Sequence, residues 1–139
     1  MDRIFIPLMP GTKRPIREAT RWQAEDADPA AWEAHAKVNG NWGLRLDGLL
    51  VIDCDTAEAH EWWLSHGYPS NWVCKTPHGW HHYYDLGEHE VPGAGPLRGP
   101  NGEQKWIDVK TGRKHYVVIP PSKLEDGGVY EWITGGDAR

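Results

Sequence analysis

The chain has 139 residues, a formal net charge of −5 and 39% hydrophobic residues, so we expect a single domain over residues 1–139 with a hydrophobic core. It has no apolar run long enough to cross a membrane and no N-terminal secretion signal, and we therefore expect a cytoplasmic protein. Two cysteines, Cys54 and Cys74, are too few for a disulfide framework or, alone, for a zinc site.

The N-terminal part of the sequence predicts a strand, a turn and a helix. The strand is the apolar run from Phe5 to Leu8, and the turn is the basic segment from Gly11 to Pro15. Asp28-Pro29 supplies an N-cap and a first-position proline, and Asn39-Gly40 ends the helix that follows.

A hairpin and a second helix come next. Trp42 to Leu46 and Leu49 to Asp55 are apolar runs on either side of Asp47-Gly48, which predicts two strands joined by a tight turn. Thr56 is then a cap for a helix that Gly67 ends, with tryptophans on its buried face.

Asp53 and Asp55 are alternate residues at the end of a predicted strand, so both project to the face of Val51. Two carboxylates about 7 Å apart along a strand can bind one divalent ion or bridge two. The alternative is a strand that runs out into a polar turn, where Asp55 or Thr56 caps the next helix.

The second half of the chain predicts four more strands and a loop. In the first strand, Trp80 to Tyr84, alternation places His82 with Trp80 and Tyr84, and we expect His81 on the other face to be structural, like His78. Gly and Pro residues at 91–102 predict a loop without regular structure, and two strands follow, at 104–110 and 116–119. A strand at Tyr130-Glu131-Trp132 closes the chain.

Four segments carry a resemblance to a known family: VIDCD (51–55), TPHGWHHYY (76–84), WIDVKTG (106–112) and HYVVIPPS (115–122). In this order they resemble the primase-polymerase (prim-pol) domain of the archaeo-eukaryotic primase superfamily, as found in phage and plasmid replication proteins. The opening strand at Phe5 and the closing strand at Trp132 extend the resemblance to nearly the whole chain.

The resemblance implies an α+β fold with an RRM-like catalytic core and an N-terminal αβ extension. It implies that Asp53, Asp55 and Asp108 bind Mg²⁺ or Mn²⁺, and that His82 contacts the phosphates of the incoming nucleotide. Further residues expected to orient the triphosphate are Lys110, His115 and Ser122. The chain departs from the family at Trp80, because many relatives have a small or hydroxyl residue two positions before the histidine, and at 111–115, which is basic.

Basic residues are the candidates for contact with a DNA template. They form an N-terminal group and a group in the second half: Lys13, Arg14, Arg98, Arg113 and Lys114. Because the net charge is negative, we expect template binding to be weak and sensitive to salt. The alternative is that these groups are solvated surface charge.

The function expected from these features is template-dependent nucleotidyl transfer by a DNA primase, a DNA polymerase or both. Its partners would be a DNA template, nucleoside triphosphates and a separately encoded helicase, in the host cytoplasm if the protein is phage-encoded. Two other classes stay open: a metal-dependent nuclease or phosphodiesterase, and a non-catalytic module that binds nucleotides or DNA. The choice between ribonucleotides and deoxynucleotides is not decided.

Overall fold

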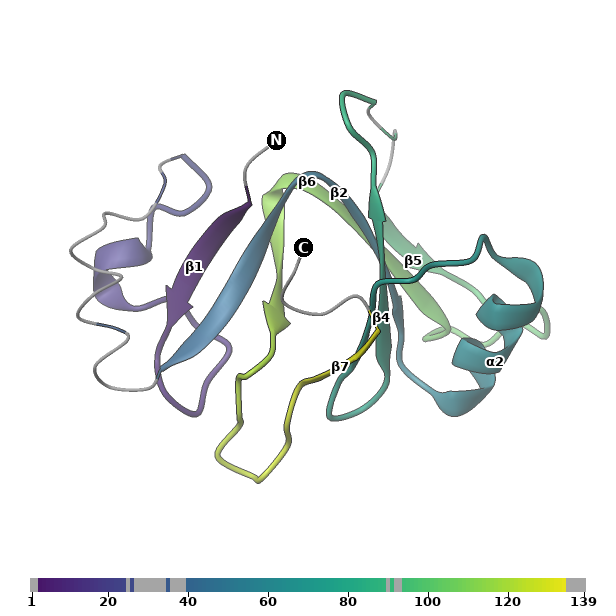
Figure 1. The fold of residues 1–139 in the computed structure, drawn as a ribbon. Coiled ribbons are helices and arrows are strands. Elements are labelled where there is room, and N and C mark those ends of the chain that lie inside the picture. Colours follow the sequence, from purple (N-terminus) through teal and green to yellow (C-terminus); the bar gives the residue numbers. More distant parts are fainter. Residues whose placement is uncertain are drawn as a thin grey trace.

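The computed structural model describes residues 3–24, 26, 35, 40–89, 91 and 94–134, whose regular structure is mostly β-strand (Figure 1). Its elements are β1 (Ile4–Leu8), the 3-10 helix η1 (Arg17–Ala19), β2 (Asn41–Cys54), α2 (Ala57–His66), β3 (Val73–Lys75), β4 (Trp80–Asp85), β5 (Gly95–Leu97), β6 (Ile107–Ile119) and β7 (Glu131–Thr134). The predicted strands at the two ends, the histidine strand and the helix after Thr56 are confirmed. The helix predicted to start at Asp28-Pro29 falls almost entirely outside the described residues.

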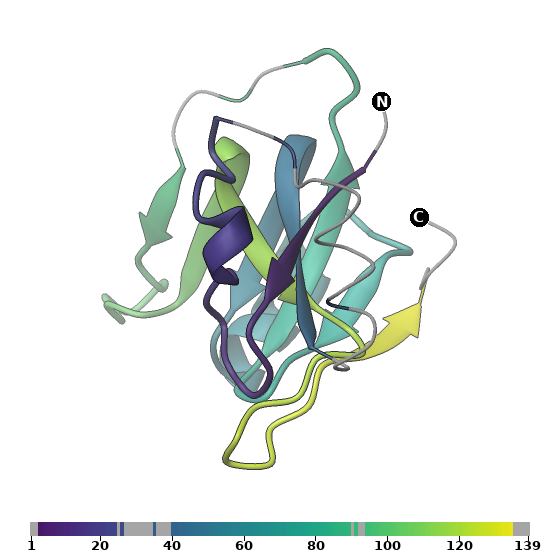
Figure 2. The same ribbon diagram turned by 90° about the vertical axis from the view of Figure 1, so that its left-hand side faces the viewer.

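All the strands belong to one antiparallel sheet in the order β5-β6-β2-β4-β3-β7, with β1 also paired to β2. The long strands β2 and β6 arch over the top of the molecule in Figure 1 and run down on both sides. One half of the arch carries β1, with η1 beside it at the front of Figure 2. The other half carries β4 and β5, so the arch connects two parts of the sheet.

The predicted hairpin at Asp47-Gly48 is wrong, because β2 continues through it without reversing. The pairing with β6 moves from Leu46 opposite Gly112 to Leu50 opposite Thr111, which leaves the residues between Leu46 and Leu50 as a bulge. Gly48 has the positive φ of 66° expected in a turn, but here it bends the strand. The Gly48 carbonyl accepts a hydrogen bond from Leu86, outside the β2–β6 ladder.

Strand β6 is also continuous, although two separate strands were predicted at 104–110 and 116–119. Residues 113–115 bulge out between Gly112 and Tyr116, and Gly112 has a φ of 91°. The loop predicted at 91–102 is wrong in one part, because β5 (Gly95–Leu97) lies within it and pairs with Ile107 to Val109. A sheet edge can satisfy the backbone even of a segment rich in Gly and Pro, and sequence composition does not reveal that edge.

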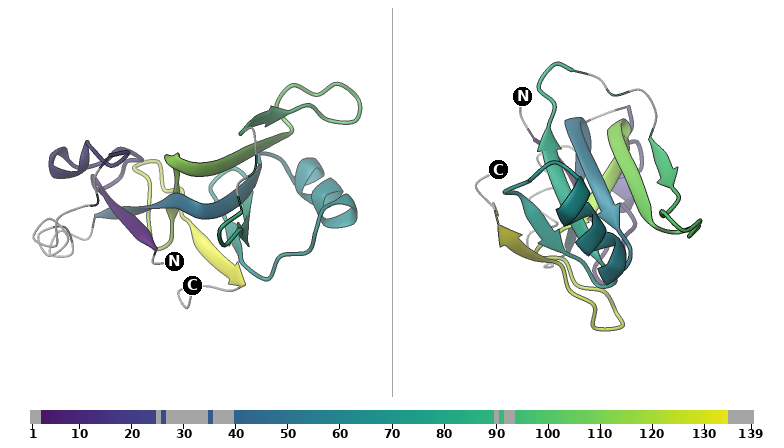
Figure 3. Two further views of the ribbon diagram at one scale, coloured as in Figure 1. Left: turned by 90° about the horizontal axis from the view of Figure 1, so that it is seen from above. Right: turned by 90° about the vertical axis from the view of Figure 1, so that its right-hand side faces the viewer.

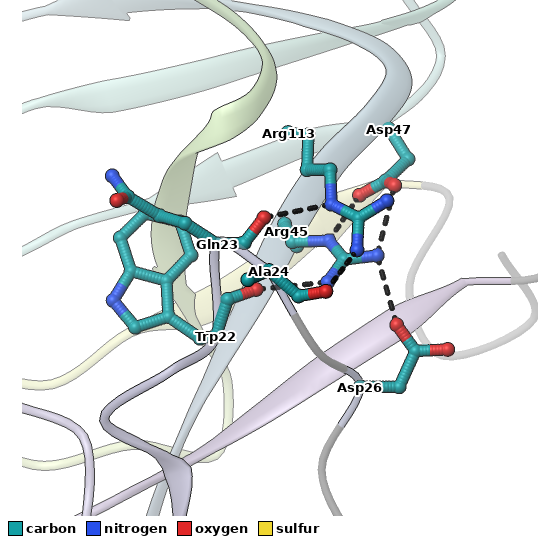
Figure 4. Close-up of polar contacts among 7 residues, drawn as sticks. All are labelled: Trp22, Gln23, Ala24, Asp26, Arg45, Asp47 and Arg113. Atoms are coloured by element: carbon teal, nitrogen blue, oxygen red, sulfur yellow. Dashed lines mark hydrogen bonds and ion pairs between the residues drawn. The ribbon is translucent and has the colours of Figure 1, made fainter.

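Arg45 holds the bend from inside the protein (Figure 4). Its side chain is 3% exposed and makes a two-pronged ion pair with Asp47 in the bulge, at 2.6 and 3.0 Å. It also donates to the Trp22 carbonyl at 2.8 Å and pairs with Asp26 at 2.9 Å. From the other bulge, Arg113 donates to the carbonyls of Gln23 and Ala24. The two arginines therefore connect the backbone of residues 22–24 to the bulges of β2 and β6.

Two apolar clusters lie on opposite faces of the sheet. The larger one fills the inner face of the arch and includes Leu44, Val51, Tyr83 and Val117. The smaller one, around Ile52, lies on the outer face under α2, which covers the sheet in the right-hand view of Figure 3. Thr56 caps this helix by accepting a hydrogen bond from the Ala59 amide. No helix of the described residues has the length and apolar character needed to cross a membrane.

Replacing Arg45 by Met is expected to lower the free energy of unfolding by about 3 kcal/mol, because the Asp47 carboxylate would be left without its partner in a largely buried site. Urea denaturation followed by circular dichroism measures the loss. The matched control is Arg17→Met, whose side chain is 94% exposed and which should change stability by less than about 0.5 kcal/mol. Equal effects of the two substitutions would contradict this role for Arg45.

Candidate active site

A cavity of about 220 Å³ opens on the inner face of the arch. Both halves of β6 contribute to it, with Lys110 on one side of the bend and Tyr116 on the other. The complete lining is Lys13, Asp53, Asp55, Thr76, Pro77, His78, His81, Lys110, Tyr116, Val117, Val118 and Tyr130. The bend in the two long strands therefore creates the hollow in which polar side chains meet.

Asp53 is the most connected carboxylate of this cavity. In the strand register it lies opposite His81 of β4 and opposite Asp108 of β6. Its Oδ1 is 3.4 Å from His81 Nε2, and its Oδ2 is 3.3 Å from Lys110 Nζ. Burial raises the pKa of the Asp53 carboxyl. The hydrogen bond and charge of His81, together with the charge of Lys110, lower this pKa by more than burial raises it, so the net pKa lies below its ordinary value.

Asp55 and Asp108 complete an acidic group around Asp53. Asp55 lies one residue beyond the end of β2, is exposed, and lines the cavity. Its pKa is raised, first by partial burial and then by the negative charge of Asp53, with Asp108 contributing in the same direction. Asp108 itself is half-buried and is not part of the cavity lining. The negative charges of Asp53 and Asp108 thus both act on Asp55.

His82 does not join this group, and its predicted convergence with the carboxylates is wrong. Successive side chains of a strand alternate faces, and His82 lies opposite Ile52 on the outer face of the sheet. There its Nε2 is 3.0 Å from Nδ1 of His60 in α2. Burial, followed by the charges of His60 and His81, lowers the pKa of His82 to about 4.

His81 is the histidine that the structure places beside Asp53, although we had expected it to be structural. The sequence does carry a signal for this choice: Gly79 stands two positions before His81, and the resemblance implies a small or hydroxyl residue two positions before the histidine. A Cβ on Gly79 would lie 1.8 Å from the carbonyl oxygen of Cys54, so no larger residue fits there.

The other predicted nucleotide-binding residues are divided. Lys110 is in the cavity, as the alternation of β6 predicts. Ser122 is 1% exposed, and its hydroxyl accepts from the Trp42 amide at 2.8 Å and faces the Trp42 carbonyl at 3.3 Å. It therefore supports the backbone and does not line the cavity. His115 is exposed and lines a different cavity, of about 720 Å³, beside the bulges.

The predicted DNA-binding residues also fall in separate places. Lys13 lines the cavity with Asp53, and its carbonyl accepts a hydrogen bond from Tyr116. Arg113 and Lys114 line the larger cavity with His115, although Arg113 already binds the backbone of residues 23 and 24. Arg14 and Arg98 are exposed and line neither cavity.

The acidic group fits a hard divalent cation. Carboxylate oxygens are the ligands that Mg²⁺ and Mn²⁺ prefer, and Asp53 and Asp55 both line the cavity, with Asp108 opposite Asp53 in the strand register. Asp53, Asp55 and Asp108 do not form a tight three-ligand group by themselves. Among the described residues, such a group, with ligand atoms within 4.8 Å of one another, consists of Cys54, His60 and His82 on the outer face.

A comparison with known protein families identifies the family of the chain. The family model described as "Bifunctional DNA primase/polymerase, N-terminal" (Prim-Pol) matches residues 4–138. The chain therefore belongs to the Prim-Pol family, which confirms the resemblance found in its sequence. No curated protein matches the chain. A mostly antiparallel sheet with α2 on one face is compatible with a prim-pol fold.

Lys110→Met is expected to raise the pKa of the Asp53 carboxyl, because it removes one of the positive charges that lower it. A carboxyl with a lowered pKa stabilises the fold above its unfolded pKa, and that contribution is lost as the pH falls through the folded pKa. The variant should therefore be less stable than wild type at neutral pH, and the difference should vanish in acid.

Carboxyl-carbon NMR shifts followed during a pH titration measure the Asp53 pKa directly. Lys114→Met is the matched control, because Lys114 lies on the same strand but lines the other cavity. A pKa of Asp53 that moves equally in the two variants, or in neither, would show that the contact with Lys110 does not govern this carboxyl.

Proposed function

We propose that the chain is a template-dependent nucleotidyltransferase that makes DNA primers, extends them, or does both. Membership of the Prim-Pol family suggests DNA primase or polymerase activity in replication. The observation that carries the proposal is the contact of Asp53 with Lys110 and His81, which brings three strands together at one cavity, with Asp108 opposite Asp53 in the register. The carboxylates would bind the divalent cations that accompany a triphosphate, and the cationic side chains would bind its phosphate oxygens.

In this proposal Asp53, Asp55 and Asp108 would hold Mg²⁺ or Mn²⁺. Such ions, when bound, neutralise charge on the phosphates and lower the barrier for attack by a 3′-hydroxyl. The side chains of the chain itself bind and orient the nucleotide. Lys110 and His81 both contact Asp53 now, and a cation on that carboxylate would free them to face the triphosphate oxygens.

The cavity walls suggest how the nucleotide is placed. Lys13 adds a positive charge at the rim, and Tyr116 offers a ring at the other side of the bend. An edge-on contact with Trp22, at 4.9 Å between ring centres, holds the Tyr116 ring in place. We propose that the triphosphate lies toward Lys110 and Lys13, with the nucleoside toward Tyr116.

The wider setting is also part of the proposal. We assign β6, β2, β4 and β3, with α2 on the outer face, to an RRM-like core, and β1 with its neighbours to the N-terminal extension. The DNA template would follow the exposed basic residues Arg14, Arg98 and Lys114, with weak and salt-sensitive affinity. A phage or plasmid replication system, with a separately encoded helicase, is the setting in which such a domain would act.

The test is extension of a labelled primer on a DNA template, and synthesis without a primer, with deoxynucleotides and ribonucleotides supplied separately. Asp53→Asn and Asp108→Asn should each lower the rate by at least about 100-fold, because each removes charge that acts on the reacting phosphate. His81→Gln should lower the rate far more than His82→Gln, which changes the outer face only. His66→Gln, on the exposed side of α2, is the control and should retain wild-type activity.

Two results would overturn the proposal. Degradation of labelled DNA with Mg²⁺ or Mn²⁺ and no nucleotides, lost in Asp53→Asn, would indicate a nuclease. Nucleotide or DNA binding that survives the Asp53 and Asp55 substitutions, without synthesis under any condition, would indicate a binding module. A stronger effect of His82→Gln than of His81→Gln would contradict the assignment of His81.

A further inference from the structure

The outer face of the sheet carries a second group of potential metal ligands, directly behind the acidic group. Cys54 ends β2, His60 lies in the first turns of α2, and His82 is in β4. Their ligand atoms lie within 4.8 Å of one another, and His82 Nε2 is 3.0 Å from His60 Nδ1. We propose that Cys54, His60 and His82 bind a zinc ion that is separate from the ions of the acidic cavity.

The ligand atoms favour zinc over magnesium or manganese. One thiolate and two imidazoles are borderline-soft ligands, which Zn²⁺ takes readily and Mg²⁺ does not. The two ring nitrogens face each other, so at most one of them carries a hydrogen in the contact. A metal ion between the two rings would instead accept a lone pair from each of these nitrogens.

The spacing requires little movement. Zinc lies about 2.0 Å from imidazole nitrogens and about 2.3 Å from sulfur in tetrahedral sites, which places two nitrogen ligands roughly 3.3 Å apart. The two nitrogens are already 3.0 Å apart. Binding would release the proton of the Cys54 thiol, leave both imidazoles neutral, and add one net positive charge to the site.

The surrounding residues hold the ligands in place. Cys54 is 0% exposed and His82 is 2% exposed, so both are fixed in the packed sheet. The His60 ring stacks on the Trp80 ring, with ring centres 4.2 Å apart and an angle of 8° between the ring planes. The Lys75 ammonium in turn lies over the Trp80 ring, 4.6 Å from its centre. Ligands that are held by neighbouring groups lose little entropy when they bind a metal.

The position of the site suggests what the zinc would do. No further Cys, His, Asp or Glu joins the three ligands in the described part of the chain, so a water molecule would take the fourth position on the side where His60 is half-exposed. Cys54 stands between Asp53 and Asp55, and His82 stands next to His81. The ion would thus fasten α2 to the two strands that carry the proposed active site.

Titration of the whole chain with Co²⁺ tests this proposal without any measurement of DNA synthesis. We expect one equivalent of Co²⁺ to produce a thiolate-to-cobalt charge-transfer band in the near ultraviolet, with visible bands of a tetrahedral site. Zn²⁺ should abolish these bands, and an excess of Mg²⁺ should not. Zn²⁺ should also raise the melting temperature of the wild-type chain.

Substitutions assign the bands to residues. Cys54→Ser should remove the charge-transfer band, and His60→Gln, at a half-exposed position that tolerates substitution, should weaken Co²⁺ binding by at least about 10-fold. The matched controls are Cys74→Ser, at the other buried cysteine, and His66→Gln, at another histidine of α2, and both should behave as wild type. Asp53→Asn should also retain the bands, because it faces the opposite side of the sheet.

The proposal is wrong if the folded wild-type chain shows no charge-transfer band, or if His60→Gln, folded by circular dichroism, binds Co²⁺ as tightly as wild type. It is also wrong if Cys74→Ser removes the band. Because the readout is spectroscopic, loss of the zinc site and loss of the proposed DNA synthesis are separate results.

Discussion

The bend shared by β2 and β6 is the feature on which the rest of the structure depends. An unbent antiparallel pair has no hollow, but here both strands bulge at the same level, at Gly48 and Gly112, and the sheet folds over itself. Arg45 fixes the bulge through its two-pronged contact with Asp47 and ties it to the Trp22 carbonyl, and Arg113 binds the carbonyls of Gln23 and Ala24. This buried charge network gives the cavity its two walls, because Lys110 lies on one side of the bend and Tyr116 on the other.

Alternation along the strands then divides the chemistry between two faces. Asp53 and Cys54 are neighbours in sequence, but one carboxylate faces the cavity and one thiol faces α2. The same holds for His81, which contacts Asp53, and His82, which contacts His60. Oxygen ligands with cationic partners gather on the inner face, and sulfur and imidazole ligands gather on the outer face. The two proposed sites, which would prefer different metal ions, would in this way lie on opposite faces of the same strands.

The charges in the cavity are balanced only in part. His81 and Lys110 keep Asp53 ionised, while burial and the charges of Asp53 and Asp108 raise the pKa of Asp55. A bound divalent cation would stabilise the negative charge of this acidic group, and a bound phosphate would stabilise the positive charge of its neighbours. This complementarity is the physical reason to place the proposed reaction of this Prim-Pol family member at this cavity.

Local sequence determined the elements whose signals are local. The Thr56 cap, the ending of its helix at Gly67, and the alternation that puts Lys110 on the face of Asp108 could all be read from neighbouring residues. The family was also recognisable from the order of its motifs. Asp47-Gly48 has the residues of a tight turn, but only the pairing of β2 with β6 on both sides of it decides that the strand bends and continues. Likewise, alternation places the adjacent histidines on opposite faces without saying which of them faces Asp53, and the register of β4 against β2 places His81, not His82, there. Register depends on contacts between residues far apart in the chain, and for that reason the tertiary structure decided it.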